Sequence, residues 1–63
     1  MATFASRDQV STPDGPGVVA HKEMKVDRGR RQWTGRYWVR LHRVLDTGRR
    51  QGHYWQRELT RNV

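Results

Sequence analysis

The chain has 63 residues, no cysteine and a formal net charge of +7. A chain of this length forms one domain and buries only about 60% of the surface that its unfolded form exposes. The lack of cysteine excludes disulfides and thiolate metal sites. No apolar run approaches the roughly 20 residues of a membrane span, and the N-terminus has no signal-peptide pattern. The sequence therefore predicts a cytoplasmic protein.

The chain begins with a segment that we expect to be a flexible tail, residues 1–7, and continues as one domain over residues 8–63. Within this domain, apolar and polar residues alternate in short runs between Gly, Pro and Asp turns, which is typical of β-strands. The runs predict four strands, at residues 9–12, 17–26, 36–45 and 50–56.

Turn residues separate these runs. Residues 13–17 and 46–48 combine Gly with Pro or Asp and predict tight turns. Residues 27–35 predict a long, basic hairpin loop. After the fourth strand, residues 57–60 predict a single helical or 3₁₀ turn, and residues 61–63 predict a last short strand.

Several short strands between Gly and Asp turns predict an all-β fold, a small antiparallel barrel or sandwich. Closure into a barrel suits so short a chain because it removes exposed sheet edges. Alternation places Tyr37, Val39 and Leu41 on the inner face of the third strand, whereas Val19 and Met24 stay open because a bulge would exchange their faces. The full predicted core is Val10, Val18, Ala20, Val26, Val39, Leu41, Val44, Tyr54, Leu59 and Val63.

Four segments carry a further pattern: residues 10–19, 37–41 and 46–48, and Glu58-Leu59 followed four residues later by Val63. The first segment is a strand that enters a glycine-rich turn and leaves through Gly-Val-Val. In this arrangement the chain resembles small SH3-like barrels of the KOW type. The resemblance implies a five-stranded antiparallel SH3-like barrel with a 3₁₀ turn before the last strand. That fold hosts binders of DNA, RNA, RNA polymerase, ribosomes and peptides, so the fold alone does not choose a function.

Positive charge is concentrated in residues 28–63, which carry ten arginines against two carboxylates, a net charge of +8. Residues 1–27 have a net charge of −1, and all three tryptophans and both tyrosines lie in the basic part. Guanidinium groups pair with phosphate and stack on aromatic faces, and an indole stacks on bases. Basic residues interleaved with aromatic ones are typical of nucleic-acid-binding proteins.

Strand alternation directs Trp38, Arg40 and His42 outward on the third strand, and His53 and Trp55 outward on the fourth. We expect these two strands to pair and to present the five side chains on one face. The remaining candidate binding residues lie in or beside the predicted loops: Arg28, Arg30, Arg31, Trp33, Arg36, Arg49, Arg50 and Arg57. The alternative for the tryptophans is that they cover the open ends of the barrel, and the alternative for the basic loop is a merely solvated segment.

The sequence thus predicts a non-enzymatic nucleic-acid-binding protein, with DNA favoured over RNA. The six carboxylates are scattered and the three histidines match no zinc spacing, so no catalytic residue, metal or cofactor is predicted. The alternative is an interaction module that docks on an acidic protein such as a polymerase, because interfaces also favour Trp, Tyr and Arg. We expect a monomer or homodimer without membrane contact, of the kind found in phages and mobile elements.

Overall fold

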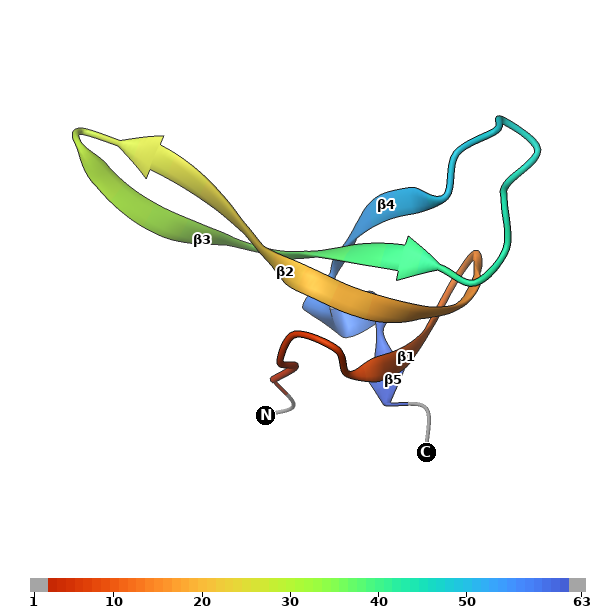
Figure 1. Cartoon of the computed structure of the whole chain (residues 1–63). Coiled ribbons are helices and arrows are strands. Elements are labelled where there is room, and N and C mark those ends of the chain that lie inside the picture. The colour runs from red at the N-terminus through yellow and green to blue at the C-terminus, as the bar shows by residue number, and fades with distance from the viewer. Residues whose placement is uncertain (1–2, 62–63) are drawn as a thin grey trace.

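The computed structural model describes residues 3–61, which form one antiparallel sheet of five strands (Figure 1). In sheet order the strands are β4 (Gln51–Trp55), β3 (Arg30–Leu41), β2 (Gly15–Asp27), β1 (Gln9–Thr12) and β5 (Thr60–Arg61). A 3₁₀ turn, η1 (Gln56–Glu58), precedes β5. The all-β fold, the five antiparallel strands and the 3₁₀ turn are therefore confirmed. Within the described residues β4 and β5 do not pair with each other, so the sheet is barrel-like but not closed.

The hairpin of β2 and β3 is the largest departure from the sequence prediction. The two strands pair out to Asp27 and Arg30, and only Arg28 and Gly29 form the turn. Both turn residues have positive φ, +53° and +77°, as a two-residue type I′ hairpin requires. The predicted loop over residues 27–35 is therefore wrong, because the cross-strand ladder continues through it. Figure 1 shows the resulting ribbon projecting beyond the rest of the sheet.

The core lies on one face of the sheet, and alternation along β3 places its centre correctly. Tyr37, Val39 and Leu41 are all at most 1% exposed. The other buried hydrophobic residues are Phe4, Val10, Val19, Tyr54 and Leu59. The predicted core positions at Val10, Val39, Leu41, Tyr54 and Leu59 are confirmed, and Val63 lies outside the described residues.

Four predicted core positions are not buried. Val19, opposite Val39, takes the inward position, so its neighbours Val18 and Ala20 turn to the other face; Val18 is half-buried and Ala20 is exposed. Two further valines lie away from the core: Val26, on the projecting ribbon and 74% exposed, and Val44, in the loop after β3 and 57% exposed. The corrections have two causes: alternation does not tell which of two adjacent valines points inward, and it does not tell how far an element lies from the core.

The segment before β1 packs against the sheet, which the sequence analysis does not predict. Phe4 is 5% exposed, and its backbone N–H donates to the Tyr37 hydroxyl at 3.1 Å. The two rings meet edge to face, with centroids 5.6 Å apart. Further along, the Arg7 N–H donates to the Val19 carbonyl oxygen at 2.8 Å. This segment therefore covers one end of the core.

Tyr54 connects β4 to the turn between β1 and β2. Its hydroxyl donates to the Asp14 carboxylate at 2.6 Å, and burial together with this hydrogen bond raises the pKa of Tyr54 to about 12. Gly52 makes this arrangement possible, because a Cβ there would lie 2.9 Å from the Tyr54 hydroxyl oxygen. The contact anchors β4 to the turn between β1 and β2, while pairing with β3 positions the residues that β4 presents on its other side.

Candidate nucleic-acid interface

The face of the sheet opposite the core carries the outward residues of β3 and β4. Directly opposed residues of antiparallel strands share a face. The register pairs Trp38 with His53, Arg36 with Trp55 and Arg40 with Gln51, whereas the intervening residues of β3 are buried. Trp38, Arg40, His53 and Trp55 thus lie on the side that alternation predicts. His42, just beyond β3, is exposed and lies 3.2 Å from the Gln9 side-chain oxygen through its Nε2.

Aromatic rings form a row across three strands on this face. The Trp38 and His53 rings are stacked, with centroids 4.9 Å apart and planes 19° apart. On the other side, His21 of β2 is paired with Trp38, and its ring centroid lies 6.4 Å away. His21 is not among the binding residues that the sequence predicts. The His21 ring is tilted by 48° to that of Trp38, so the row is an aromatic surface that is not flat, and a base or sugar can pack against it.

A groove of about 530 Å³ borders this row and will be called the Trp38 groove. Its lining consists of Trp38, Arg49, Arg50, Gln51, Gly52 and His53. The chain enters β4 here from the loop after β3, and the Leu41 N–H donates to the Arg50 carbonyl oxygen at 2.7 Å, which anchors that entry. Four of the predicted binding residues therefore meet in one place, with two exposed arginines beside a stacked aromatic pair.

Glu23 is an acidic residue that this face holds among its basic ones. Its carboxylate accepts hydrogen bonds from Arg36, at 2.9 Å from Nε and 2.6 Å from Nη2, and lies 2.6 Å from His53 Nδ1. Thr34 Oγ1 donates to the same carboxylate at 3.0 Å. The hydrogen bond with His53, with those from Thr34 and Arg36, holds the pKa of Glu23 below its usual 4.5 against the opposing effect of burial. Arg36 is thus engaged within the protein.

This network predicts an acid-sensitive contribution to stability. A carboxylate whose pKa is lowered by folding stabilises the fold above its unfolded pKa, and the contribution is lost as the pH falls through the folded value. We expect Glu23→Gln to lower the melting temperature at pH 7, and we expect the gap to the wild type to close as the pH falls below 4.5. Thermal unfolding across pH measures this. Asp46→Asn, in the exposed loop, is the control, and a gap that does not depend on pH would contradict the assignment.

Trp55 lies apart from the Trp38 groove and packs within the protein. The guanidinium groups of Arg36 and Arg57 lie over its ring, 5.2 Å and 5.5 Å from the centroid. Its six-membered ring covers Gly35, where a Cβ would approach to 3.3 Å. Its backbone N–H donates to the Glu58 carboxylate at 2.9 Å, at the start of η1. Trp55 is 40% exposed, but two arginines already lie over its ring as stacking partners.

Trp33 is placed differently from the sequence prediction. It belongs to β3, not to a loop, and its half-buried ring meets Tyr37 with centroids 5.3 Å apart. Its Nε1–H donates to the Arg36 carbonyl oxygen at 2.8 Å, and Lys22 Nζ lies 5.0 Å from its ring centroid. Trp33 therefore extends the core along the ribbon.

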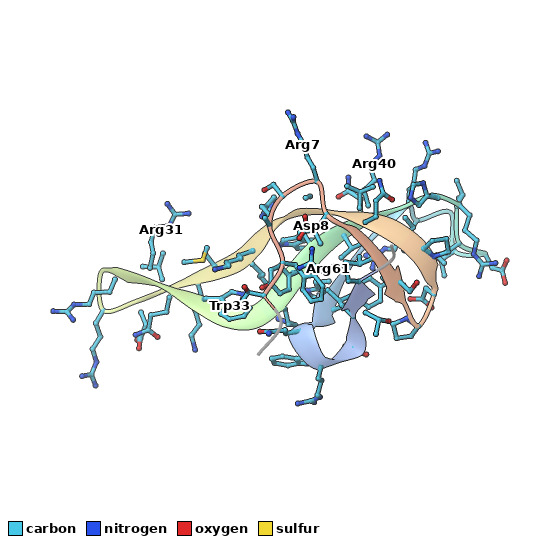
Figure 2. All side chains as sticks on the ribbon, turned by 90° about the horizontal axis from the view of Figure 1, so that it is seen from below. Arg7, Asp8, Arg31, Trp33, Arg40 and Arg61 are labelled. Atoms are coloured by element: carbon cyan, nitrogen blue, oxygen red, sulfur yellow. The ribbon has the colours of Figure 1, made fainter. Side chains whose placement is uncertain are left out.

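The remaining predicted arginines lie at the tip of the ribbon, away from the Trp38 groove. Arg28, Arg30 and Arg31 are exposed there. Figure 2 shows Arg31 projecting to the same side of the molecule as Arg7 and Arg40. Arg7 lies in the predicted tail, and no local sequence signal identifies it as a candidate binding residue.

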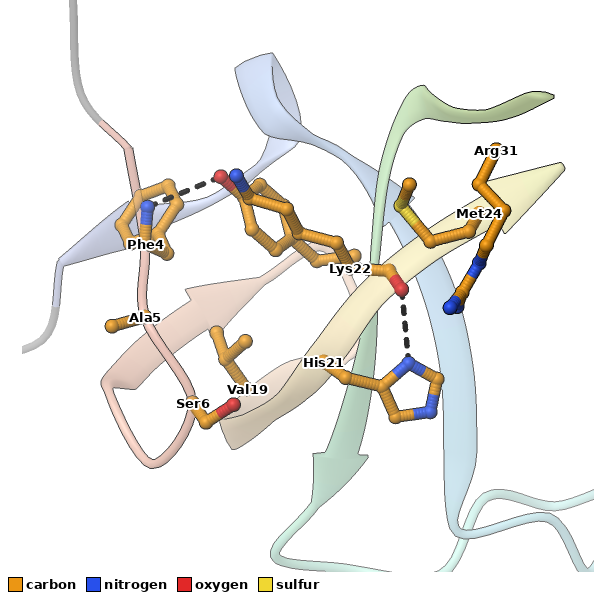
Figure 3. A pocket seen from close by; sticks show the side chains of 9 residues that line it. Phe4, Ala5, Ser6, Val19, His21, Lys22, Met24 and Arg31 are labelled. Atoms are coloured by element: carbon orange, nitrogen blue, oxygen red, sulfur yellow. Dashed lines mark hydrogen bonds between the residues drawn. The ribbon is translucent and has the colours of Figure 1, made fainter.

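A second pocket, of about 560 Å³, separates the segment before β1 from the ribbon (Figure 3). Its walls include Phe4 and Ser6 on one side and Lys22, Met24 and Arg31 on the other. In Figure 3, Phe4 lies across the pocket from Met24 and Arg31. The pocket marks the base of the ribbon and shows that the ribbon leaves the core at this point.

Comparison of the chain with family models, with curated proteins and with solved structures finds no significant match. Among residues 3–61 no group of three His, Asp or Glu side chains is placed to hold a metal ion. In the same part of the chain no helix has the length and apolar character needed to cross a membrane.

Proposed function

We propose that the chain is a non-enzymatic nucleic-acid-binding protein, with DNA favoured over RNA, whose binding site centres on the Trp38 groove. The supporting observation is the stacked pair of Trp38 and His53 beside Arg49 and Arg50 in one groove. The arginines bind backbone phosphates, and the aromatic pair packs against a base or a sugar. Arg40, opposite Gln51 at the groove, adds a further phosphate contact.

The distribution of ion pairs supports this proposal. Within residues 3–61 the carboxylates in ion pairs are Glu23 and Asp8, and their partners are Arg36, His53 and Arg61. Arg40, Arg49 and Arg50 are exposed and do not take part in these pairs. Their charge therefore remains to attract a polyanion.

We further infer that the barrel-like sheet is an SH3-like barrel of the KOW type. The supporting features are the strand order β4-β3-β2-β1-β5 and the 3₁₀ turn before the last strand. This fold accommodates both nucleic-acid and protein ligands, so it is neutral between the proposed function and docking on an acidic protein.

Salt dependence of binding tests the proposal directly. If three to five phosphates are neutralised, the logarithm of the affinity should fall against the logarithm of salt with a slope of about −2.7 to −4.5 on duplex DNA. Fluorescence anisotropy of a labelled DNA oligomer, titrated at several salt concentrations, measures this slope. Binding weaker than about millimolar at low salt, or binding without a salt slope, would contradict the proposal and favour a protein partner.

Single substitutions localise the site. Arg50→Ala should weaken binding and reduce the magnitude of the slope by about 0.9, because one phosphate contact is lost. Arg43→Ala is the control, because it removes the same charge from an exposed residue that does not line the Trp38 groove. Equal effects of the two substitutions would indicate a diffuse charge effect and would place the site elsewhere.

A further inference from the structure

The outer part of the β2–β3 ribbon, residues 24–33, will be called the arm. Beyond the pair of Met24 with Trp33, the arm continues through three more cross-strand pairs to the turn at Arg28 and Gly29. Within the described residues no third strand pairs with it. We propose that the arm enters the major groove of duplex DNA with its tip first, an inference that rests on the proposed function and names its ligand more closely.

The dimensions of the arm suit that groove. From the pair of Met24 with Trp33 to the pair of Asp27 with Arg30 there are three residue steps, which at about 3.3 Å each give a projection of roughly 10 Å. The major groove of B-form DNA is about 12 Å wide and 8.5 Å deep and admits a two-stranded ribbon. A-form RNA has a deep, narrow major groove that side chains do not read, and a single strand has no groove. The arm therefore favours duplex DNA.

The charges of the arm lie on both of its faces. Lys25, Arg28, Arg30 and Arg31 outnumber the single carboxylate of Asp27, which gives the arm a net charge of +3. The register puts Arg30 and Lys25 on one face and Arg31 on the other, opposite Val26. A ribbon lying flat on DNA needs cations on one face only. Cations on both faces match an arm held between the two phosphate-lined walls of a groove.

The tip of the arm is suited to close approach. The backbone at Gly29 has no side chain, and a Cβ there would meet nothing within 4 Å. The neighbouring Arg28 is exposed at the far end of the ribbon, where it reaches the groove floor first. Arginine bonded to guanine O6 and N7 is the commonest specific contact in the major groove. We therefore assign to Arg28 the contact with base edges and to Arg31 a contact with a flanking phosphate.

The side of the molecule to which Arg31 projects also carries basic residues of the body of the protein (Figure 2). Arg31, Arg7 and Arg40 project to the same side of the molecule (Figure 2). Arg40 lies opposite Gln51, which lines the Trp38 groove. A DNA strand that forms one wall around the arm thus continues along Arg7 and Arg40 toward the groove, which joins the two contacts into one surface.

The test compares a variant of the arm with a matched control on two forms of DNA. The arm variant is Arg28→Asn with Arg31→Ala, in which asparagine tolerates the positive φ of the turn. The control is Arg43→Ala with Arg61→Ala, two exposed arginines outside the arm and the Trp38 groove. The probes are a mixed-sequence DNA duplex of two helical turns and a single strand of the same length, at one salt concentration.

We expect the wild type to bind the duplex at least about tenfold more tightly than the single strand. The arm variant should lose about 5- to 150-fold on the duplex but less than about threefold on the single strand, and the control pair should change both by the same small factor. Methylation of guanine N7, an atom of the major groove, should weaken duplex binding by the wild type and not by the arm variant. Thermal unfolding confirms that the arm variant is folded.

Two outcomes overturn the inference while leaving the proposed function intact. One is wild-type binding to duplex and single strand with equal affinity. The other is an arm variant that behaves like the control pair on both probes. A folded wild type that binds neither probe overturns the proposed function together with the arm.

Discussion

Phe4→Ala should destabilise the protein by about 3 kcal/mol, the low end of the range for removing a buried phenyl ring. The ring is 5% exposed and packs edge to face on Tyr37, the residue at the centre of the core. The whole stability of a domain of this size is roughly 3–9 kcal/mol. One substitution therefore removes a large fraction of it and lowers the melting temperature by roughly 12–24 °C.

Thermal unfolding followed by circular dichroism measures this change. Thr3→Ala is the matched control, because Thr3 is exposed and receives the Arg61 guanidinium on its backbone oxygen, which the substitution keeps. We expect this variant to melt within about 2 °C of the wild type, as exposed substitutions usually do. If Phe4→Ala melts like the wild type, Phe4 belongs to a flexible tail and the packing of this segment is wrong.

The role of Phe4 illustrates what local sequence patterns do not reveal. Its hydrogen-bond partner, Tyr37, lies 33 residues away, and the segment before β1 has no alternation to mark an inward side chain. A single apolar residue in a polar segment looks like part of a tail. Phe4 packs there because the sheet leaves one end of the core uncovered next to Tyr37.

The elements that the sequence predicts correctly are those with strong local rules. β1 has the predicted bounds, and alternation along β3 identifies Tyr37, Val39 and Leu41 as the inner face. The turn at residues 46–48 is also present. Pairing of β3 with β4 then follows from their succession in the chain, which is why Trp38 and His53 are expected on one face and are found there.

The arm is missed because its turn is unusual and its strands are charged. The common signals for a type I′ turn are Asn-Gly and Asp-Gly, whereas here the turn is Arg28-Gly29. The run of arginines around the turn is typical of a solvated loop. This signal outweighs the strand propensity of Trp33 and Thr34, which lie in β3. The basic residues of the arm are held on paired strands and not on a loop, which supports the proposal that they bind a ligand.

Glu23 and its partners are a tertiary feature that no spacing predicts. Irregularities in the β2–β3 register lie on both sides of Lys22, and Glu23 meets groups from β3 and β4. Its carboxylate neutralises Arg36 and holds His53 beside Trp38. The acidic residue therefore organises the basic face, and the count of arginines available to phosphate is smaller than the sequence indicates.

Trp38→Ala should weaken binding to nucleic acid by about 5- to 150-fold, the effect of losing an aromatic platform worth about 1–3 kcal/mol. The indole lies at the centre of the aromatic row and lines the groove that holds Arg49 and Arg50. Trp38→Tyr keeps an aromatic surface and should lose much less. Anisotropy of a labelled oligomer gives the affinities, and quenching of tryptophan fluorescence on binding should be strongly reduced in Trp38→Ala.

Trp55→Ala is the matched control for that experiment, since it removes the same side chain from a position outside the Trp38 groove. The indole of Trp55 already has Arg36 and Arg57 over it, so its loss should alter stability but should change affinity by less than about threefold. A folded Trp38→Ala that binds nucleic acid as the wild type does would remove the platform from the mechanism. If that same variant lost binding to an acidic protein instead, the face would be a protein-docking surface. Interfaces with protein and with nucleic acid both use Trp and Arg, so only the ligand whose binding is lost distinguishes the two functions.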